Sequence, residues 1–252
     1  MSPILRGVVI FAGLLLLWQA VVTLAVLPPY ILPGPAAVGA ALVEHAAAIS
    51  THALHTLAEI VLGLCLGAGL GCGTALVMSF FRPARRWLTP VMVVSQAIPV
   101  FAIAPLLVLW LGYGMASKIA MAVLIIYFPV TASFFDGLRR TEPGWLDLAR
   151  SMGAGRWAIL RHVRLPAALP ALASGLRVAT AVAPIGAVIG EWVGASAGLG
   201  YLMLHANARV QIDVMFAALA TLAMIGVTLY FTVDTLLRRL LRWQPQSLFM
   251  DD

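Results

Sequence analysis

The sequence predicts an all-α protein that crosses a membrane six times and has both termini in the cytoplasm. Of its 252 residues, 62% are hydrophobic and only 10% are charged, whereas a soluble domain has about 25% charged residues. Such a chain cannot cover a water-facing surface with polar groups, but it suits a lipid environment. No stretch has the composition of a separate soluble domain, so we expect one transmembrane domain over residues 1–252.

Six stretches are long and apolar enough to cross about 30 Å of hydrocarbon as helices. They cover about residues 8–27, 56–80, 87–111, 119–135, 169–190 and 214–237. The first stretch is longer than the apolar core of a signal peptide, which has about 7–15 residues, and no small-residue cleavage site follows it. We therefore expect it to be retained as a helix.

The distribution of Lys and Arg predicts the orientation, because cytoplasmic connections carry an excess of basic residues. Fourteen of the 16 Lys and Arg residues fall on one side of the predicted spans. These are Arg6, Arg82, Arg85, Arg86, Arg139, Arg140, Arg150, Arg156, Arg161, Arg164, Arg177, Arg238, Arg239 and Arg242. Only Lys118 and Arg209 fall on the other side. Topology thus explains the net charge of +6 without a nucleic-acid partner.

Three connections between the predicted spans are long. The external segment 28–50 contains helix-breaking prolines and then a short interfacial helix over residues 36–48. Residues 139–168 form an arginine-rich cytoplasmic loop. The external segment 191–213 is partly apolar, and we expect it to dip back toward the membrane.

Glycines form a stripe along the second predicted span at Gly63, Gly67 and Gly71. This spacing places three hydrogen side chains on one helical face, so another helix backbone can approach closely. We favour packing within the chain over a dimer interface, because such stripes are common in any helical bundle.

Four prolines interrupt the later predicted spans: Pro99, Pro105, Pro129 and Pro184. Each lacks a backbone donor and clashes with the preceding turn, so each should kink or loosen its helix. Kinks are tolerated where the freed carbonyls face protein or a water-filled cavity, which is typical of a translocation path. Kinks that only improve helix packing are the alternative.

Charged residues inside the predicted spans are few, so each is a functional candidate. Glu59 shares one helical face with His52 and His55. These are zinc-type ligands, but three ligands on one short stripe cannot close a tetrahedral shell by themselves. We expect instead a local His55–Glu59 pair, or a polar group that lines an outward-facing cavity.

A second candidate pair, Glu191 and Trp192, ends the fifth predicted span. A carboxylate beside an indole can hold a flat polar ring, because the acid accepts hydrogen bonds and the indole stacks. An interfacial Trp beside a solvated Glu fits the sequence equally well. The whole predicted translocation pathway comprises Glu59, Ser95, Gln96, Pro99, Tyr127, Pro184, Glu191 and Trp192.

No motif in the sequence indicates catalysis. The chain lacks a Walker-type phosphate loop, a His-Glu-x-x-His metal motif and a Gly-x-Ser-x-Gly nucleophile motif. We therefore expect neither an enzyme nor a bound metal. The energy for uphill transport must come from a partner or from an ion gradient.

The cytoplasmic loop 139–168 is the most informative segment of the chain. It predicts two short helices broken at Gly153-Ala154-Gly155, which present Asp147 and apolar side chains to the cytoplasm. This arrangement suits docking into a groove on another protein. The alternative is an amphipathic loop that its arginines hold at the lipid headgroups.

This loop resembles the signature of ABC importer permeases, Glu-Ala-Ala-x-x-x-Gly-x9-Ile-x-Leu-Pro. Asp147 stands in place of the Glu, Leu148 in place of the first Ala, and Val163 in place of the Ile. Four other positions match at the expected spacing, namely Ala149, Gly153, Leu165 and Pro166. The resemblance implies that the ATPase subunit contacts Asp147, Ala149, Gly153, Val163, Leu165 and Pro166.

The resemblance extends from Leu32 to Arg242 and is closest to the nitrate, sulfonate and taurine branch of binding-protein-dependent permeases. Within that branch, several stretches resemble permeases for thiamine pyrimidine precursors of the hydroxymethylpyrimidine type, and riboflavin permeases share much of the pattern. The stretches are Thr56-Leu57-Ala58-Glu59-Ile60, Ser95-Gln96-Ala97-Ile98-Pro99, and Gly190-Glu191-Trp192-Val193-Gly194 with Gly198-Leu199-Gly200-Tyr201.

The resemblance implies a type I ABC importer permease fold in a bacterial inner membrane. It implies a homodimer that binds two cytoplasmic ATPase subunits, which use ATP and Mg²⁺, and a periplasmic or lipid-anchored binding protein. The permease then binds no cofactor directly and moves a small polar solute, such as a thiamine pyrimidine precursor, from periplasm to cytoplasm.

Riboflavin, a sulfonate, taurine or nitrate are the alternative solutes. A proton-coupled secondary transporter that uses Glu59 or Glu191 is the alternative from another class, but no inverted repeat supports it. A membrane-embedded enzyme would need paired catalytic side chains, which the sequence does not offer. A lipid-facing scaffold would not need four kinking prolines.

Overall fold

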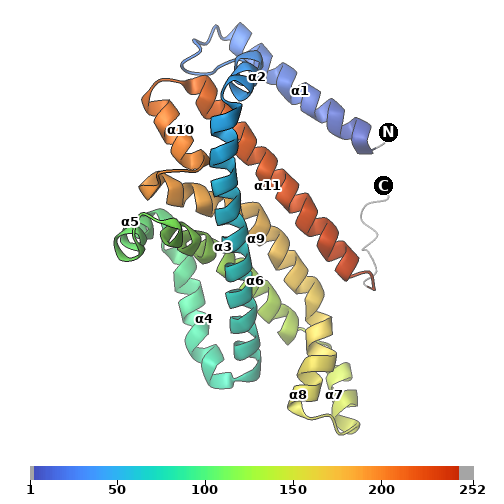
Figure 1. The fold of residues 1–252 in the computed structure, drawn as a ribbon. Coiled ribbons are helices and arrows are strands. Elements are labelled where there is room, and N and C mark those ends of the chain that lie inside the picture. Colours follow the sequence, from blue (N-terminus) through green and yellow to red (C-terminus); the bar gives the residue numbers. More distant parts are fainter. Residues whose placement is uncertain (1–2, 244–252) are drawn as a thin grey trace.

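The computed structural model of the chain describes residues 3–243, and within this range the regular structure is helical, without a strand (Figure 1). The elements are α1 Pro3–Leu24, α2 Pro35–Glu44, α3 Ala46–Phe80, α4 Arg82–Ala97, α5 Val100–Leu111, α6 Met115–Arg139, α7 Pro143–Ser151, α8 Arg156–Ile159, the π-helical turn η1 Leu160–Arg164, α9 Leu165–Gly194, α10 Leu199–Ala208 and α11 Ile212–Leu240. The predicted all-α fold is confirmed.

The bundle has two different ends (Figure 1). Helices α2 and α10 lie at one end, which we call the α10 end. The short helices α7 and α8 lie at the other end, together with the turn that joins α3 to α4, and we call this the hairpin end.

Five helical segments of the described chain are long and apolar enough to cross a membrane, and the bent pair α4–α5 makes a sixth if it is one span. The third predicted span is therefore not a single kinked helix. Its two halves meet at 102°. Ile98 adopts extended backbone angles because the ring of Pro99 disfavours a helical conformation in the residue before it.

Helix α6 lies at the centre of the fold because glycines let it pack closely against both α3 and α9. The whole glycine stripe of α3 faces α6: a Cβ added at Gly67 would lie 2.7 Å from Ile126 Cγ2. On α9, a Cβ added at Gly186 would lie 2.7 Å from Ala122 Cα. Real side chains do not fit at such distances, so these contacts require glycine. The stripe packs within the protomer, as we predicted.

The loop between α6 and α9 breaks where the glycines predict a break. Helix α7 ends at Ser151, and Gly153 has a φ of +79°, a conformation that favours glycine. The expected second short helix is not separate, because α8, η1 and α9 form one continuous helix over Arg156–Gly194. The π turn η1 ends two residues before Pro166, where the helical ladder loses a donor.

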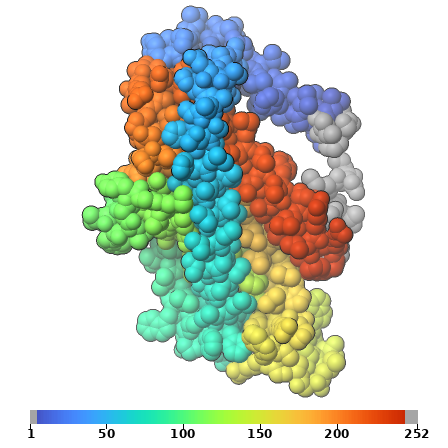
Figure 2. All heavy atoms as spheres, viewed as in Figure 1, coloured from blue at the N-terminus to red at the C-terminus, as the bar shows by residue number. Residues whose placement is uncertain are grey.

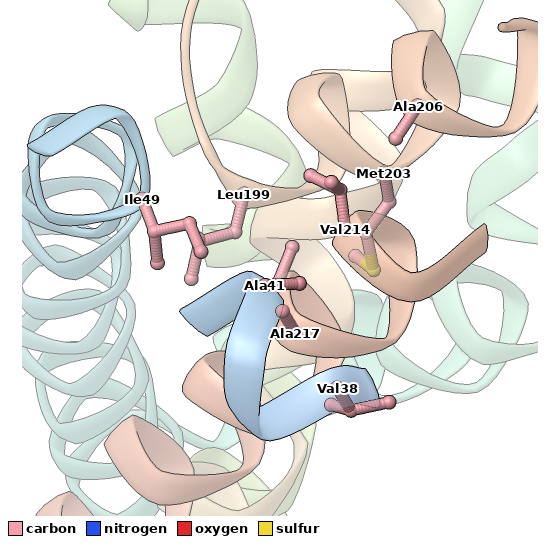
Figure 3. Close-up of a cluster of buried hydrophobic side chains, with 9 residues drawn as sticks. Val38, Ala41, Ile49, Leu199, Met203, Ala206, Val214 and Ala217 are labelled. Carbon is pink, nitrogen blue, oxygen red and sulfur yellow. The ribbon is translucent and has the colours of Figure 1, made fainter. Parts of the chain in front are cut away.

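A cluster of buried apolar side chains closes the α10 end (Figure 3). It joins α2, α3, α10 and α11 through Val38, Ala41, Ile49, Leu199, Met203, Ala206, Val214, Ala217 and Ala218. The interfacial helix predicted over residues 36–48 is α2, which ends at Glu44 because α3 begins two residues later. The external segment expected to dip back contains α10, which packs against α3, α9 and α11.

The outside of the bundle is rich in large exposed hydrophobic side chains, in particular on α1, α4 and α5. Helix α1 projects from the rest of the molecule (Figure 2), and no residue of its apolar window is buried. In water such a surface would aggregate, whereas lipid tails cover it at no cost.

Candidate translocation and coupling sites

Four polar side chains are buried together between α3, α6 and α9 near the α10 end, and we call them the polar cluster. They are Thr56, Glu59, Lys118 and Glu191, with 0%, 2%, 6% and 1% of their surface exposed. Gly190 allows this convergence, since a Cβ there would lie 3.0 Å from Lys118 Cα. A buried polar group is costly unless it is bonded, so the partners of each one matter.

Glu191 is the hub of the polar cluster. Its Oε1 accepts a hydrogen bond of 2.6 Å from the Thr56 hydroxyl, and its Oε2 accepts one from the backbone N–H of Gly200. The Thr56 hydroxyl in turn accepts a bond of 2.8 Å from the N–H of Leu199. Helix α9 is thereby tied to α3 and to the first turn of α10.

The loop before α10 has to fold tightly around this carboxylate. Gly198 has a φ of +114°, and a Cβ at this position would overlap the Glu191 carboxyl group. The N–H of Gly198 donates to His52 Nδ1 at 3.0 Å. His52 is therefore a hydrogen-bond acceptor for this loop, and no group of three metal-type ligands occurs within residues 3–243.

Glu59 pairs with Lys118, with 3.6 Å between Glu59 Oε1 and Lys118 Nζ. The expected His55–Glu59 pair is wrong, because Glu59 points from α3 into the contact with α6. Glu59 Oε2 has no hydrogen-bond partner, and the carboxyl group of Glu191 is its direct neighbour. Of these two neighbouring carboxyl groups, Glu59 is the one that pairs with the Lys118 ammonium group.

Thr56 is not among the predicted pathway residues, and neither is Lys118. The positive-inside count places it in an external connection, whereas the side chain is buried in the first turns of α6. A Lys at the start of an apolar helix needs a counter-ion, and that requirement is the signal that points to Glu59.

Trp192 and the α4–α5 break lie together on an exposed surface. Trp192 is 45% exposed, and its ring centroid is 6.2 Å from that of Phe101, just after the break at Pro99. Gln96 and Pro99, at the same α4–α5 break, are also exposed. Glu191, by contrast, points inward, so the expectation of a solvated Glu beside an interfacial Trp is wrong for the Glu.

The other residues of the predicted pathway are not part of this surface. Ser95 is half-buried and donates to the Met92 carbonyl at 2.7 Å. Tyr127 is half-buried and packs against the apolar core. Pro184 faces α11, where a Cβ at Gly226 would lie 3.4 Å from its Cγ.

The hairpin end presents the residues of the loop signature. A groove of about 550 Å³ runs between α7 and the base of α9. It is lined by Trp145, Leu148, Ala149, Met152, His162, Val163, Pro166, Ala167 and Trp243. Three of the predicted coupling residues, Ala149, Val163 and Pro166, thus come together in one groove.

The remaining coupling residues lie around this groove. Asp147 is exposed and accepts a hydrogen bond of 2.7 Å from Arg150 Nη1. Gly153 forms the exposed turn after α7, with no neighbour within 4 Å of an added Cβ. Leu165 instead packs inward against the core between α3 and α6.

Comparison with known proteins finds one family over most of the chain. Residues 63–244 match the family described as "Binding-protein-dependent transport system inner membrane component". A probable ABC transporter permease protein of Haemophilus influenzae is 59% identical over 94% of this chain and 96% of its own length. The riboflavin transport system permease protein RibX of Chloroflexus aurantiacus is 41% identical over 92% of this chain and 87% of its own.

A third relative and one solved structure complete the comparison. The formylaminopyrimidine transport permease protein ThiX of Halalkalibacterium halodurans is 34% identical over 96% of this chain and 97% of its own. A solved chain of the MetNI methionine ABC transporter, in an inward-facing conformation, is 19% identical and superposes with a TM-score of 0.67. That match covers 78% of this chain and 97% of the other, and it shows a common fold.

Proposed function

Since the chain belongs to the family of binding-protein-dependent transport system inner membrane components, we propose that two copies of it form the path by which an ATP-driven importer takes up a flat nitrogen heterocycle. The chain is the permease subunit of an ABC importer, a multi-pass membrane protein. It is not an enzyme, because separate subunits hydrolyse ATP in this family. The family also excludes the alternative of a proton-coupled secondary transporter.

The Trp192–Phe101 contact at the α4–α5 break is the observation that supports a heterocyclic solute. Exposed aromatic rings stack on flat rings, and the nearby exposed amide of Gln96 can donate to and accept from ring substituents. We therefore assign the wall of the pathway to Gln96, Pro99, Trp192 and the Phe101 ring. The buried Glu59 and Glu191 hold this wall in place from behind.

Two of the reported relatives carry names that fit this chemistry, since formylaminopyrimidine and riboflavin both contain flat nitrogen rings. A thiamine pyrimidine precursor is the first candidate, as the resemblance of the sequence implies. Riboflavin is the second. A sulfonate, taurine or nitrate has no ring to stack, so the aromatic pair argues against them.

We assign the docking of the ATPase subunit to the hairpin end. Two exposed apolar side chains, Leu148 and Met152, lie beside the turn at Gly153 and suit insertion into a groove on a partner. By this proposal Asp147, Ala149, Val163 and Pro166 contact the ATPase directly, and Leu165 anchors the loop to the core. The hairpin end and both termini then lie in the cytoplasm of a bacterial cell, and the chain binds no cofactor.

Uptake into proteoliposomes tests the solute assignment. The chain is reconstituted with its ATPase subunits and binding protein, and labelled hydroxymethylpyrimidine, riboflavin and taurine are supplied separately. We expect ATP-dependent uptake of the pyrimidine, which Trp192→Ala lowers about tenfold while ATPase association stays normal. Trp87→Ala, an exposed Trp near the opposite end of α4, is the matched control. Uptake of taurine alone, insensitive to Trp192→Ala, would overturn the proposal.

A further inference from the structure

A cavity of about 880 Å³ opens at the hairpin end, between the turn that joins α3 to α4 and the helices α7 and α8. Six arginines line it and no carboxylate does, so we call it the arginine pocket. They are Arg82, Arg85, Arg86, Arg150, Arg156 and Arg164. Helix α4 supplies the first three, and the α7–η1 part of the chain, far from α4 in the sequence, supplies the others; Figure 1 shows both at this end of the molecule.

The charges of the arginine pocket are not balanced by the described part of the chain. Among residues 3–243, Arg150 alone of the six forms an ion pair, with Asp147 of its own helix. Arg164 Nε is buried and has no hydrogen-bond partner. A buried donor without an acceptor is costly, and like charges around one cavity repel each other. Both costs disappear when an anion enters the pocket.

We propose that the arginine pocket binds the phosphate of an anionic phospholipid headgroup. The planar guanidinium group matches phosphate oxygens with two parallel hydrogen bonds, which makes arginine well suited to this anion. The positive-inside rule explains why arginines occur at this end of the bundle, but any distribution over the connections satisfies that rule. Their convergence on one cavity is an additional property, and a bound phosphate accounts for it.

The rim of the arginine pocket favours a lipid over a soluble phosphate. Phe80 and Phe81 line the cavity where the apolar helix α3 ends, and both are exposed. Trp157 packs edge-on against Phe80, with 6.2 Å between the ring centroids. Aromatic side chains at the end of a spanning helix mark the headgroup level, and basic pockets at this level bind anionic headgroups. A soluble phosphate would use the same guanidinium groups but would gain nothing from the aromatic rim.

Lipid titration of the purified full-length chain tests this proposal. Dioleoylphosphatidylglycerol, dioleoylphosphatidylcholine and inorganic phosphate are added separately, and bound lipid or anion is counted by native mass spectrometry. We expect dioleoylphosphatidylglycerol to bind about tenfold more tightly than dioleoylphosphatidylcholine. The phosphate of the first carries a net negative charge, whereas the choline ammonium group of the second neutralises its phosphate. The double variant Arg86→Gln with Arg164→Gln should remove most of this preference.

Two further variants separate a binding site from general basic charge. Arg140→Gln with Arg161→Gln removes the same charge at two exposed positions of the hairpin end outside the pocket, and should change lipid affinity by less than about twofold. Arg82→Gln with Arg86→Gln changes only exposed pocket residues, so it serves if the variant at Arg164 fails to fold.

Three outcomes would overturn the proposal. The first is an equal loss of lipid preference in the pocket variants and in the control. The second is binding of inorganic phosphate that the pocket variants weaken, without binding of dioleoylphosphatidylglycerol. That result would assign the pocket to a soluble anion. The third is loss of the lipid when the ATPase subunits are bound, which would assign the arginines to the protein interface.

Discussion

The two ends of the bundle treat charge in opposite ways. At the α10 end, the charged groups are buried and bonded to one another. The carboxyl group of Glu191 accepts hydrogen bonds from Thr56 and Gly200, and Glu59 pairs with Lys118. At the hairpin end, six arginines surround an open pocket, and of these Arg150 alone is paired within the described part of the chain.

This difference indicates what each end is for. Buried polar groups that are bonded to one another define a single arrangement of the helices around them, at the cost of removing charge from water. Charges left without partners contribute little to the fold, and they are available to molecules that the chain meets at that surface. We infer that the α10 end holds its shape by itself, whereas lipid and ATPase complete the hairpin end.

Gly198→Ala is expected to have the largest effect and to break the α10 end. Alanine at this position would have to adopt a strained positive φ, and its Cβ would overlap the Glu191 carboxyl group. Together these two effects cost roughly 3 kcal/mol of stability. Thermal unfolding of the detergent-purified protein, followed by size-exclusion chromatography, measures this loss.

Gly153→Ala is the matched control for this substitution, because Gly153 also has a positive φ but has open space around it. It should cost only about 1–2 kcal/mol. Equal losses in the two variants would show that backbone strain alone matters and that the carboxylate does not order the loop.

Glu191→Ala is expected to have the next largest effect on stability. It removes the acceptor for the Thr56 hydroxyl and the Gly200 N–H, and two buried donors without acceptors cost about 2–3 kcal/mol. Glu191→Gln keeps one acceptor oxygen and should lose about half as much. If Glu191→Ala unfolds at the wild-type temperature and yet abolishes uptake, Glu191 contacts the solute and the structural role is wrong.

The contrast also separates what the sequence predicts well from what it does not. Hydropathy depends on local composition, so the positions of the apolar spans agree with the helices. The glycine stripe predicts close packing of α3 against another helix of the chain, and the structure shows that this helix is α6. Partners of buried charges depend on packing between distant segments: Thr56 and Glu191 are 135 residues apart. The sequence therefore identifies Glu59 and Glu191 as exceptional, but it does not show that they face the interior or that Lys118 joins them.

The α4–α5 break shows the same limit in the backbone. Pro99 predicts a disturbed helix, and the helix is disturbed there. Helix α5, which is bent by 102° from α4, packs Ala104 and Val108 against α6 and α9. Pro105 has the same local chemistry and yet lies inside a continuous helix, so proline alone does not determine the bend.

Gly153→Pro tests the hairpin end, where we expect function to fail and the fold to persist. Proline requires a φ near −65°, so the turn at +79° cannot form. Helix α7 is then displaced from its position beside the base of α9. We expect uptake to fall at least about tenfold through lost ATPase association. The amount of protein in the membrane should stay within about twofold of wild type, because few core contacts involve α7. Normal uptake and normal ATPase association in this variant would contradict the docking assignment.

The smallest expected effect on stability comes from Asp147→Asn, and it gives the sharpest form of the comparison. Asp147 and Arg150 form an ion pair of 2.7 Å, but both side chains are largely exposed, so water screens the pair and its loss should cost less than about 0.5 kcal/mol. The ATPase assignment predicts a larger effect on association. Docking removes water from the Asp147 carboxylate, so water no longer replaces the interactions that are lost when the charge is removed. Pull-down of the ATPase subunits and thermal unfolding, measured on the same preparation, should therefore diverge for Asp147→Asn.

For Glu191→Gln, at the other end of the bundle, thermal stability should fall first and association only as the protein unfolds. If both variants lower stability and association in the same proportion, the two ends do not differ in the way their charges suggest.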